Sequence, residues 1–459
     1  MTNEKTKMSN FKFRIILIPI LVFLLIVAVI LNVAFAVFAP TLDSLFVSTT
    51  ILSDVPDAAK AFDDSKEMAK KIQNEGTVLL KNEDDLLPLG SKTDKLNFFG
   101  WGSYEPVYSG YGSGGMRPQT DMTRFTTLVA AFEAEGYDVN DELMTAYREF
   151  CDERVNPGNV TNHNYSIYEL PAEEYESLMT NVKDFSDYAV ITISRAGGEG
   201  DDIPMPGQMN DSSTDVGHYG VQYGQSDTKH YLELSDDEEA MIDLVCDNFD
   251  NVIVLVNTLN PMELGFLDDH EEIKSALWIG GPGTSGFASV ADIVKGDVNP
   301  SGRLTDTYAY DAMSAPSFDN FGYKTFYDEA DVQGPLNATL QFANYVEGIY
   351  VGYRYYETRY MNDEAAYNAA VQYPFGYGMS YTTFEQELGA CYELGGEIVM
   401  PVTVTNTGDV AGKDVVQVYV TAPYIEGGIE KPYVALAGFG KTDIIEPGDS
   451  ATVNIMIDV

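Results

Sequence analysis

Near-continuous apolar segments alternate with amphipathic segments through the middle of the chain. The apolar segments have the length and β-branched content of strands; they are Leu96–Gly102, Tyr188–Ser194, Asn251–Asn257 and Ile273–Gly280, with a weaker one at Tyr137–Asn140. The segments between them have helical periodicity; they are Arg124–Glu135, Asp141–Glu153, Glu173–Val182, Ser235–Phe249 and Ser285–Val294. Apolar strands separated by helices predict an α/β fold, with a mostly parallel sheet covered by helices on both faces.

Local signals set some of the helix ends in this pattern. Ser235 precedes Glu238 by three residues, which is the pattern of a capping box at a helix start. An earlier amphipathic helix is expected from about Pro56 to Glu75, and Gly76 ends it. In parallel sheets, ligands meet the loops at the carboxyl ends of the strands, so we expect the chemically active residues on those loops.

After about Phe384 the pattern changes to short alternating segments without helices. The strand-like segments are Glu397–Asn406, Val415–Ala422 and Ala451–Ile457, and turn sequences rich in Gly separate them. This pattern predicts an antiparallel β-sandwich. A complete domain of that kind needs about seven strands, so we expect the chain to end inside this domain.

The N-terminal part contains a long uncharged apolar run, residues 15–39. It is long enough to cross a hydrocarbon core of about 30 Å as a helix. The residues before it are basic, which predicts a cytoplasmic N-terminus and an extracellular remainder; they are Lys5, Lys7, Lys12 and Arg14. A cleaved signal peptide is the alternative, with Ala34 and Ala36 near a cleavage site, but the run exceeds the usual signal core. We favour a single-pass anchor in the cell membrane.

Composition narrows the possible partners. The chain of 459 residues has 71 acidic and 27 basic side chains, a formal net charge of −44, so nucleic acid is excluded as a partner. The acidic surface suits an extracellular domain that meets neutral substrates, or it serves only solubility. The cysteines are few and far apart, which argues against a disulfide framework; they are Cys151, Cys246 and Cys391. The four histidines show no ligand spacing, so we expect no metal and no cofactor.

Several long motifs occur in order along the chain. They include Glu75–Leu89, the glycine-rich stretch FGWGSYEPVYSGYGSGGM, the stretch ISRAGGEGDD, and the long segments Ala276–Thr307 and Tyr373–Phe384. In these motifs and their order, the chain resembles the C-terminal α/β-sandwich domain of glycoside hydrolase family 3. The tail Val402–Val420 resembles the fibronectin-III-like domain that often follows, and the likeness covers about residues 60–459.

The resemblance implies a domain organisation, and one part of it is missing. We expect a cytoplasmic basic segment, an anchor, a linker, the α/β-sandwich domain and a truncated fibronectin-III-like domain, at residues 1–14, 15–39, 40–60, 61–384 and 385–459. Family members also have a TIM-type barrel whose nucleophilic Asp lies in a segment reading Ser-Asp-Trp, which this sequence lacks. We expect the barrel beyond Val459, on another chain, or lost.

The resemblance implies that Glu199 is the catalytic acid/base. A retaining glycosidase needs two carboxyl groups, one of which protonates the leaving oxygen and then deprotonates water. Gly198 and Gly200 leave room for a sugar and allow unusual backbone dihedrals, which suits that role. Read without the family, the same sequence is a flexible turn with a solvated carboxylate. Asp201 and Asp202 are weaker alternatives.

Three further residues are candidates for substrate binding. Arg195 either orients a carboxylate or sugar hydroxyl or pairs with a structural acid. Tyr108 and Tyr111, beside glycines, either stack on a sugar or pack in the core, and Trp101 is expected in the core. The glycine-rich loops lack the lysine of a phosphate loop and are interpreted as strand-to-helix turns.

Three function classes follow from this sequence. The first is the membrane-anchored part of a retaining, exo-acting β-glycosidase, a β-glucosidase or β-xylosidase that acts on a β-glycoside or oligosaccharide. It would supply the acid/base, and a family 3 barrel would supply the nucleophile. The second is a non-catalytic carbohydrate-binding or scaffold protein at the cell surface that has lost its barrel. The third is a surface protein with neither role, whose β domain mediates contacts.

Overall fold

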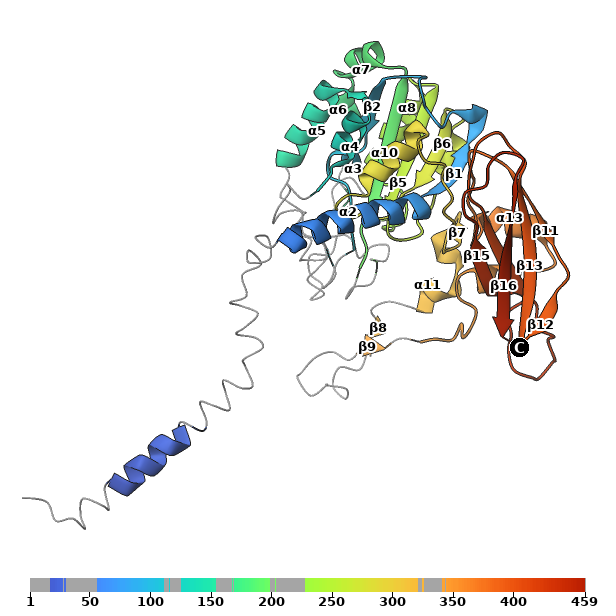
Figure 1. Cartoon of the computed structure of the whole chain (residues 1–459). Coiled ribbons are helices and arrows are strands. Elements are labelled where there is room, and N and C mark those ends of the chain that lie inside the picture. Colours follow the sequence, from blue (N-terminus) through green and yellow to red (C-terminus); the bar gives the residue numbers. More distant parts are fainter. Residues whose placement is uncertain are drawn as a thin grey trace, which may run out of the picture. The chain divides into compact units, whose positions relative to one another are not determined.

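A computed structural model describes most of the chain outside its N-terminal part (Figure 1). The described residues are 17–27, 29, 56–110, 115, 125–153, 167, 169–198, 203, 228–320, 324–325, 341–342 and 344–458. The chain divides into two compact units, Met1–Ser65 and Lys66–Val459. In the first unit, residues 17–27 are helical. Within the described ranges, no helix combines the length and the apolar character needed to cross a membrane.

A six-stranded sheet forms the centre of the second unit. Its order is β1-β6-β5-β4-β2-β3, and the strands are β1 (Val78–Asn82), β2 (Lys95–Phe99), β3 (Asp138–Val139), β4 (Tyr188–Arg195), β5 (Asn251–Thr258) and β6 (Ile273–Trp278). All neighbours pair in parallel except β1, which is antiparallel to β6. Seven consecutive residues of β4 and of β5 are buried, which requires cover on both faces. The predicted mostly parallel α/β sheet is confirmed.

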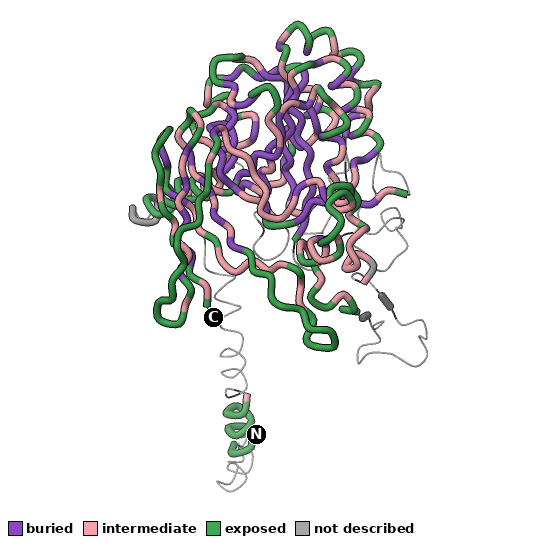
Figure 2. The backbone as a smooth tube through the Cα atoms, turned by 90° about the vertical axis from the view of Figure 1, so that its right-hand side faces the viewer, coloured by how far each residue is buried: buried purple, intermediate pink, exposed green. Residues whose placement is uncertain are grey.

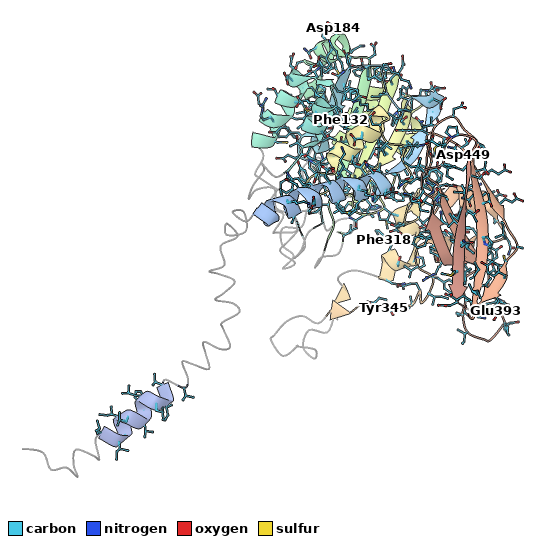
Figure 3. All side chains as sticks on the ribbon, in the orientation of Figure 1. Phe132, Asp184, Phe318, Tyr345, Glu393 and Asp449 are labelled. Carbon is cyan, nitrogen blue, oxygen red and sulfur yellow. The ribbon has the colours of Figure 1, made fainter. Side chains whose placement is uncertain are left out.

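Helices precede, connect and follow these strands. They are α2 (Pro56–Gly76), η2 (Glu83–Asp85), α3 (Trp101–Tyr104), α4 (Leu128–Ala134), α5 (Asp141–Glu153), α6 (Ala172–Tyr175), α7 (Met179–Phe185), α8 (Asp236–Cys246), α9 (Phe266–Asp269) and α10 (Phe287–Lys295). Phe132 of α4 lies in the interior (Figure 3) and meets the ring of Phe98 of β2 edge to face at 5.0 Å. Buried backbone is concentrated in this α/β part (Figure 2).

Several local predictions are confirmed and others are wrong. The predicted capping box of Ser235 and Glu238 is present at the start of α8, and Cys246 is a buried core residue of that helix. The strand predicted through Gly102 ends at Phe99, because Gly100 takes a left-handed φ of 86° and Trp101 begins α3. The helix predicted over 173–182 is two short helices, α6 and α7.

The segment between the sheet and the C-terminal domain consists of short elements. They are β7 (Tyr308–Ala309), η6 (Ala312–Ser314), α11 (Pro316–Asn320), β8 (Lys324–Thr325), β9 (Gln341–Phe342), α12 (Tyr353–Arg359), α13 (Glu364–Ala370) and β10 (Val371–Tyr373). The ring of Tyr353 stacks on Phe375 at 4.5 Å and meets Tyr419 edge to face at 6.2 Å. Its hydroxyl accepts a hydrogen bond from the backbone N–H of Leu436. Tyr353 of α12 therefore packs against the C-terminal domain.

The C-terminal domain is a small antiparallel β-sandwich. One sheet contains β11 (Phe384–Leu388), β12 (Tyr392–Leu394), β13 (Glu397–Asn406) and β16 (Ser450–Asp458), and the other contains β14 (Val415–Val420) and β15 (Ala435–Lys441). Their core is small; its buried members are Val402, Val404, Val416, Val418, Ile445 and Ile455. Large apolar side chains of the edge strand β12 remain exposed, Leu394 by 58%. The predicted β-sandwich is confirmed.

Charged contacts join the β-sandwich to the α/β part of the same unit. Lys413 and Lys441 both pair with Glu75, the latter at 2.7 Å, and Arg303 pairs with Asp414 at 2.6 Å. Burial would raise the pKa of Glu75, but the two ammonium groups reverse this effect and lower it. The end of helix α2 is thus held against the sandwich by two cations.

Candidate active site

The candidate site lies at the sheet edge where parallel strands end. Because β2, β4, β5 and β6 run in parallel, their carboxyl ends face the same way and their following loops meet there. The backbone N–H of Gly283, after β6, donates to the carbonyl of Tyr108, after β2, at 2.8 Å. The N–H of Leu259, after β5, donates to the carbonyl of Arg195, at the end of β4. The backbone therefore ties these loops together in pairs.

Asn257 joins two of these loops to the end of strand β4. Its side chain is fully buried near the end of β5. The amide nitrogen donates to the carbonyls of Val107 at 2.9 Å and Gly280 at 2.6 Å. The amide oxygen accepts from the Val107 N–H at 2.7 Å and from the Ser194 hydroxyl at 2.8 Å. This role of Asn257 was not predicted from the sequence, although a polar residue inside the apolar segment NVIVLVN indicates one.

Arg195 ends β4 with a guanidinium that is completely buried. Two of its N–H groups bind the two carboxylate oxygens of Glu238, at 2.8 and 2.6 Å. The other three bind the carbonyls of Tyr231, Glu233 and Ser194. A guanidinium has five N–H donors, so all of them are used inside the protein. This geometry favours the pairing with a structural acid over contact with a sugar.

The residues that follow Arg195 are held on several sides. The N–H of Ala196 donates to the Tyr231 hydroxyl at 2.6 Å, and the carbonyl of Ala196 accepts from the Asn260 amide at 3.1 Å. A Cβ on Gly197 would lie 2.5 Å from that amide nitrogen, and one on Gly110 would lie 3.0 Å from the Gly197 carbonyl. A side chain at either position would therefore require a neighbouring group to shift. The stem of the loop is therefore fixed up to its glycines.

Only some of the predicted site residues belong to the part of the chain that the structure describes. Glu199, Tyr111 and the alternatives Asp201 and Asp202 lie outside the described residues. Tyr108 is placed and is only 7% exposed. Its ring meets Phe125 at 4.9 Å and Phe287 at 5.5 Å, both edge to face, and burial with nearby Glu105 raises its pKa to about 12. These contacts favour core packing for Tyr108.

A second buried carboxylate supports the loop after β2. Glu169 accepts hydrogen bonds from the hydroxyls of Tyr175 at 2.7 Å and Tyr147 at 3.2 Å. It also accepts from the N–H groups of Trp101 at 2.9 Å and Leu170 at 2.8 Å. Burial nevertheless raises its pKa to about 7 against the lowering effect of these donors. The first N–H of α3, at the candidate site, is thus bound by a carboxyl group whose pKa is about 7.

Three groups of side chains among the described residues have metal-ligand character. They are Cys246 with His270 and Glu272, His230 with Glu233 and Glu263, and Glu135 with Asp292 and Asp297. The first group lies at the opposite end of the strands, since His270 and Glu272 precede β6 and Cys246 precedes β5. In the second group, His230 Nε2 lies 3.3 Å from Glu263 and 3.5 Å from Glu233.

Comparison with known proteins assigns the chain to a family. Residues 77–353 match the model of the glycosyl hydrolase family 3 C-terminal domain, and residues 414–459 match that of the fibronectin type III-like domain. The first match covers more than half of the chain. The protein therefore belongs to glycoside hydrolase family 3, as the motifs predict.

Relatives and solved structures agree with this assignment. Beta-glucosidase A of Butyrivibrio fibrisolvens is 32% identical over 401 residues, which are 83% of this chain and 44% of the relative. The beta-glucosidase of Ruminococcus albus is 30% identical over 402 residues, 85% and 36% of the two chains. Beta-glucosidase 3B of Thermotoga neapolitana, solved with glucose, superposes with a TM-score of 0.65 at 31% identity, over 88% of this chain and 50% of that one. The chain thus spans half or less of the length of these relatives.

Loss of the partner of Arg195 should be costly. In Glu238→Ala, the guanidinium stays buried without its counter-charge, so we expect a loss of about 3–5 kcal/mol in the free energy of unfolding. Glu239→Ala, at the next position of α8, is the matched control, because the Glu239 side chain pairs with Lys229 but is 52% exposed. We expect it to lower the free energy of unfolding by less than about 1 kcal/mol. Urea unfolding of both variants measures the difference. Equal losses would contradict a structural role for the Arg195–Glu238 pair.

Glu169 should make stability depend on pH in a defined window. Its pKa is 4.5 in the unfolded chain and about 7 in the folded one, so the folded state binds the proton more tightly. The free energy of unfolding therefore falls by about 3 kcal/mol in total as pH rises from about 4.5 to 7. This stabilisation by the bound proton is fully present below that window and is lost above it. Glu169→Gln removes the titration.

Thermal unfolding from pH 4 to 8 tests this prediction. The difference between wild type and Glu169→Gln should change with pH inside the window and level off above it. Glu174→Gln, an exposed position on the neighbouring helix α6, is the control and should follow the wild type at every pH. A constant difference between wild type and Glu169→Gln across the whole range would refute the assignment.

Proposed function

We propose that this chain is the acid/base-bearing part of a retaining β-glycosidase, of the β-glucosidase type. The observation that carries the proposal is the fixed loop stem at the sheet edge. Arg195 is clamped by Glu238, Ala196 is bound on both backbone groups, and Gly197 abuts Asn260. A rigid stem that ends in glycines immediately before Glu199 suits a carboxyl group that must approach a leaving oxygen closely.

The chemistry assigned to Glu199 has two steps. Its protonated carboxyl donates the proton to the glycosidic oxygen as the bond to the anomeric carbon breaks. The resulting carboxylate then takes a proton from the water that hydrolyses the glycosyl intermediate. The second carboxyl group, the nucleophile, belongs to the family's barrel domain in this proposal, since the sequence of this chain contains no Ser-Asp-Trp segment.

The substrate in this proposal is a β-glycoside or a short oligosaccharide. The relatives from Butyrivibrio and Ruminococcus bear the name beta-glucosidase, and the Thermotoga structure holds glucose. The strongly acidic composition disfavours anionic polymers and is compatible with neutral sugars. A cofactor has no part in the proposed reaction, because the two carboxyl groups supply all the proton transfer and nucleophilic chemistry.

The chain by itself is expected to lack turnover, and Glu199 is testable once a barrel is present. The purified chain should not hydrolyse aryl β-glucosides, since one of the two catalytic carboxyl groups is missing. In a form that contains the barrel, Glu199→Gln should lower kcat about 10²–10⁴-fold on substrates with poor leaving groups. The loss should be less than about tenfold on activated aryl glycosides, which need little protonation.

Asp201→Asn and Asp202→Asn are the matched controls for this experiment. Each removes a neighbouring carboxylate that the sequence leaves as an alternative, and each should retain most of the activity on both kinds of substrate. Wild-type activity in Glu199→Gln would exclude Glu199 as the acid/base. Turnover by the chain alone would exclude the division of the two carboxyl groups between two domains.

We also propose that residues 15–39 anchor the protein in the cell membrane with the N-terminus in the cytoplasm. The uncharged run and the preceding basic residues support this proposal. The protein should sediment with membranes, resist extraction by salt and dissolve in detergent, whereas a variant without residues 1–39 should stay in the supernatant. A mature N-terminus just after Ala36 would instead identify a cleaved signal peptide.

A further inference from the structure

A mixed set of metal-ligating side chains meets at the sheet edge opposite the candidate active site. Cys246 is the last residue of α8, and His270 and Glu272 lie just before β6. One donor atom from each of the three residues lies within 4.8 Å of the others. Cys246 is only 7% exposed, and the His270 side chain is 22% exposed. A thiol, an imidazole and a carboxylate from two segments of the chain thus share one small volume.

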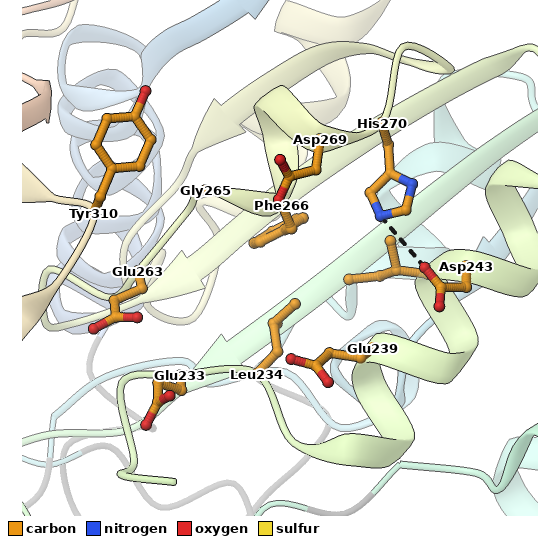
Figure 4. Close-up of a pocket in the computed structure, with 11 residues that line it drawn as sticks. Glu233, Leu234, Glu239, Asp243, Glu263, Gly265, Phe266, Asp269, His270 and Tyr310 are labelled. Carbon is orange, nitrogen blue, oxygen red and sulfur yellow. Dashed lines mark ion pairs between the residues drawn. The ribbon is translucent and has the colours of Figure 1, made fainter. Parts of the chain in front are cut away.

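A fourth group and a neighbouring cavity accompany these three. Asp243, one turn before Cys246 on α8, places a carboxylate oxygen 3.5 Å from Nε2 of His270. Both residues line one end of a cavity of about 330 Å³ that runs along α8, where Figure 4 shows them facing each other. The Asp243 side chain is 69% exposed, so it can turn toward an ion that enters from this cavity.

The other two groups with ligand character are already satisfied within the protein. Nδ1 of His230 accepts the N–H of Leu232 at 3.1 Å, so the neutral ring carries its proton on Nε2, toward the two glutamates, and has no lone pair free there. In the third group, Lys70 pairs with Asp292 and Lys295 pairs with Glu135, both at 2.7 Å. Those lysines occupy the place that a cation would take.

We propose that Cys246, His270 and Glu272 bind one Zn²⁺ ion, with Asp243 as a supporting carboxylate. Sulfur, nitrogen and oxygen donors together suit zinc better than calcium or magnesium, which prefer oxygen alone. Tetrahedral zinc would hold such donors about 3.3–3.8 Å apart. The three side chains therefore need to close by only about 1 Å.

The ion would link the end of α8 to the segment that enters β6. This role is structural, because the site lies at the amino ends of β5 and β6, whereas the proposed acid/base follows the carboxyl end of β4. The inference is therefore independent of the proposed glycosidase activity. The spacing of these residues along the chain predicts no metal site, and only the fold brings Cys246 to His270.

Metal titration of the purified chain tests the site. After treatment with a chelator, the chain should take up one Zn²⁺ per molecule in competition with a chromophoric chelator, and its melting temperature should rise. Co²⁺ added in place of Zn²⁺ should produce the charge-transfer absorption of a cobalt–thiolate bond. Cys246→Ser and His270→Gln should each weaken zinc binding at least about 100-fold, and Asp243→Asn should weaken it about 10–100-fold.

Matched variants separate this site from adventitious binding. Cys391→Ser removes the exposed cysteine, and His230→Gln alters the other histidine–carboxylate group; both should bind zinc like the wild type. His270 is partly exposed, so its variant is expected to fold, which far-ultraviolet circular dichroism checks. The proposal is overturned if Co²⁺ gives no thiolate band, if the band survives in Cys246→Ser, or if it disappears in Cys391→Ser.

Discussion

One buried charge fixes the structure at the carboxyl ends of the parallel strands, where the candidate active site lies. The guanidinium of Arg195 lies at the end of β4 with no exposed surface, and a charge in that position is stable only if it is paired and fully hydrogen-bonded. Glu238 supplies the counter-charge, and the carbonyls of Ser194, Tyr231 and Glu233 complete the shell. The sheet, helix α8 and the chain segment before α8 are thereby joined at one point. The loop that carries the proposed acid/base begins at that point.

Polar side chains inside an apolar sheet carry out the rest of the positioning. Asn257 binds the loops after β2 and β6 and the end of β4, and Glu169 binds the first N–H of α3. Each is buried, so each hydrogen bond forms without competition from water and leaving one unmade is costly. This arrangement explains why polar residues occur at the carboxyl ends of strands that are otherwise apolar. The same edge thus combines a rigid scaffold with glycines whose backbones lie close to neighbouring groups.

Local physics explains which elements the sequence could predict. The boundaries of α5 and the capping box of α8 depend on contacts within a few residues, and both are confirmed. The bounds of β13 are also confirmed, because its alternating apolar residues mark the strand along the sequence although its partner β16 is distant. Strand β1 was not predicted, since its pairing partner β6 lies almost 200 residues further along the chain. The helical start at Trp101 was missed for a similar reason, because Glu169, which binds its N–H, is distant in sequence.

The sequence by itself determined the fold class, the β-sandwich, the family and the acidic character of the protein. Apolar periodicity and long motifs carry that information, since they depend on neighbouring residues along the chain. Only the tertiary structure decided that Arg195 pairs with Glu238, that Tyr108 packs in the core, and that Cys246 meets His270. Those contacts join residues that are far apart in sequence, and the packing of distant segments, which no local pattern encodes, selects one partner among several possible ones.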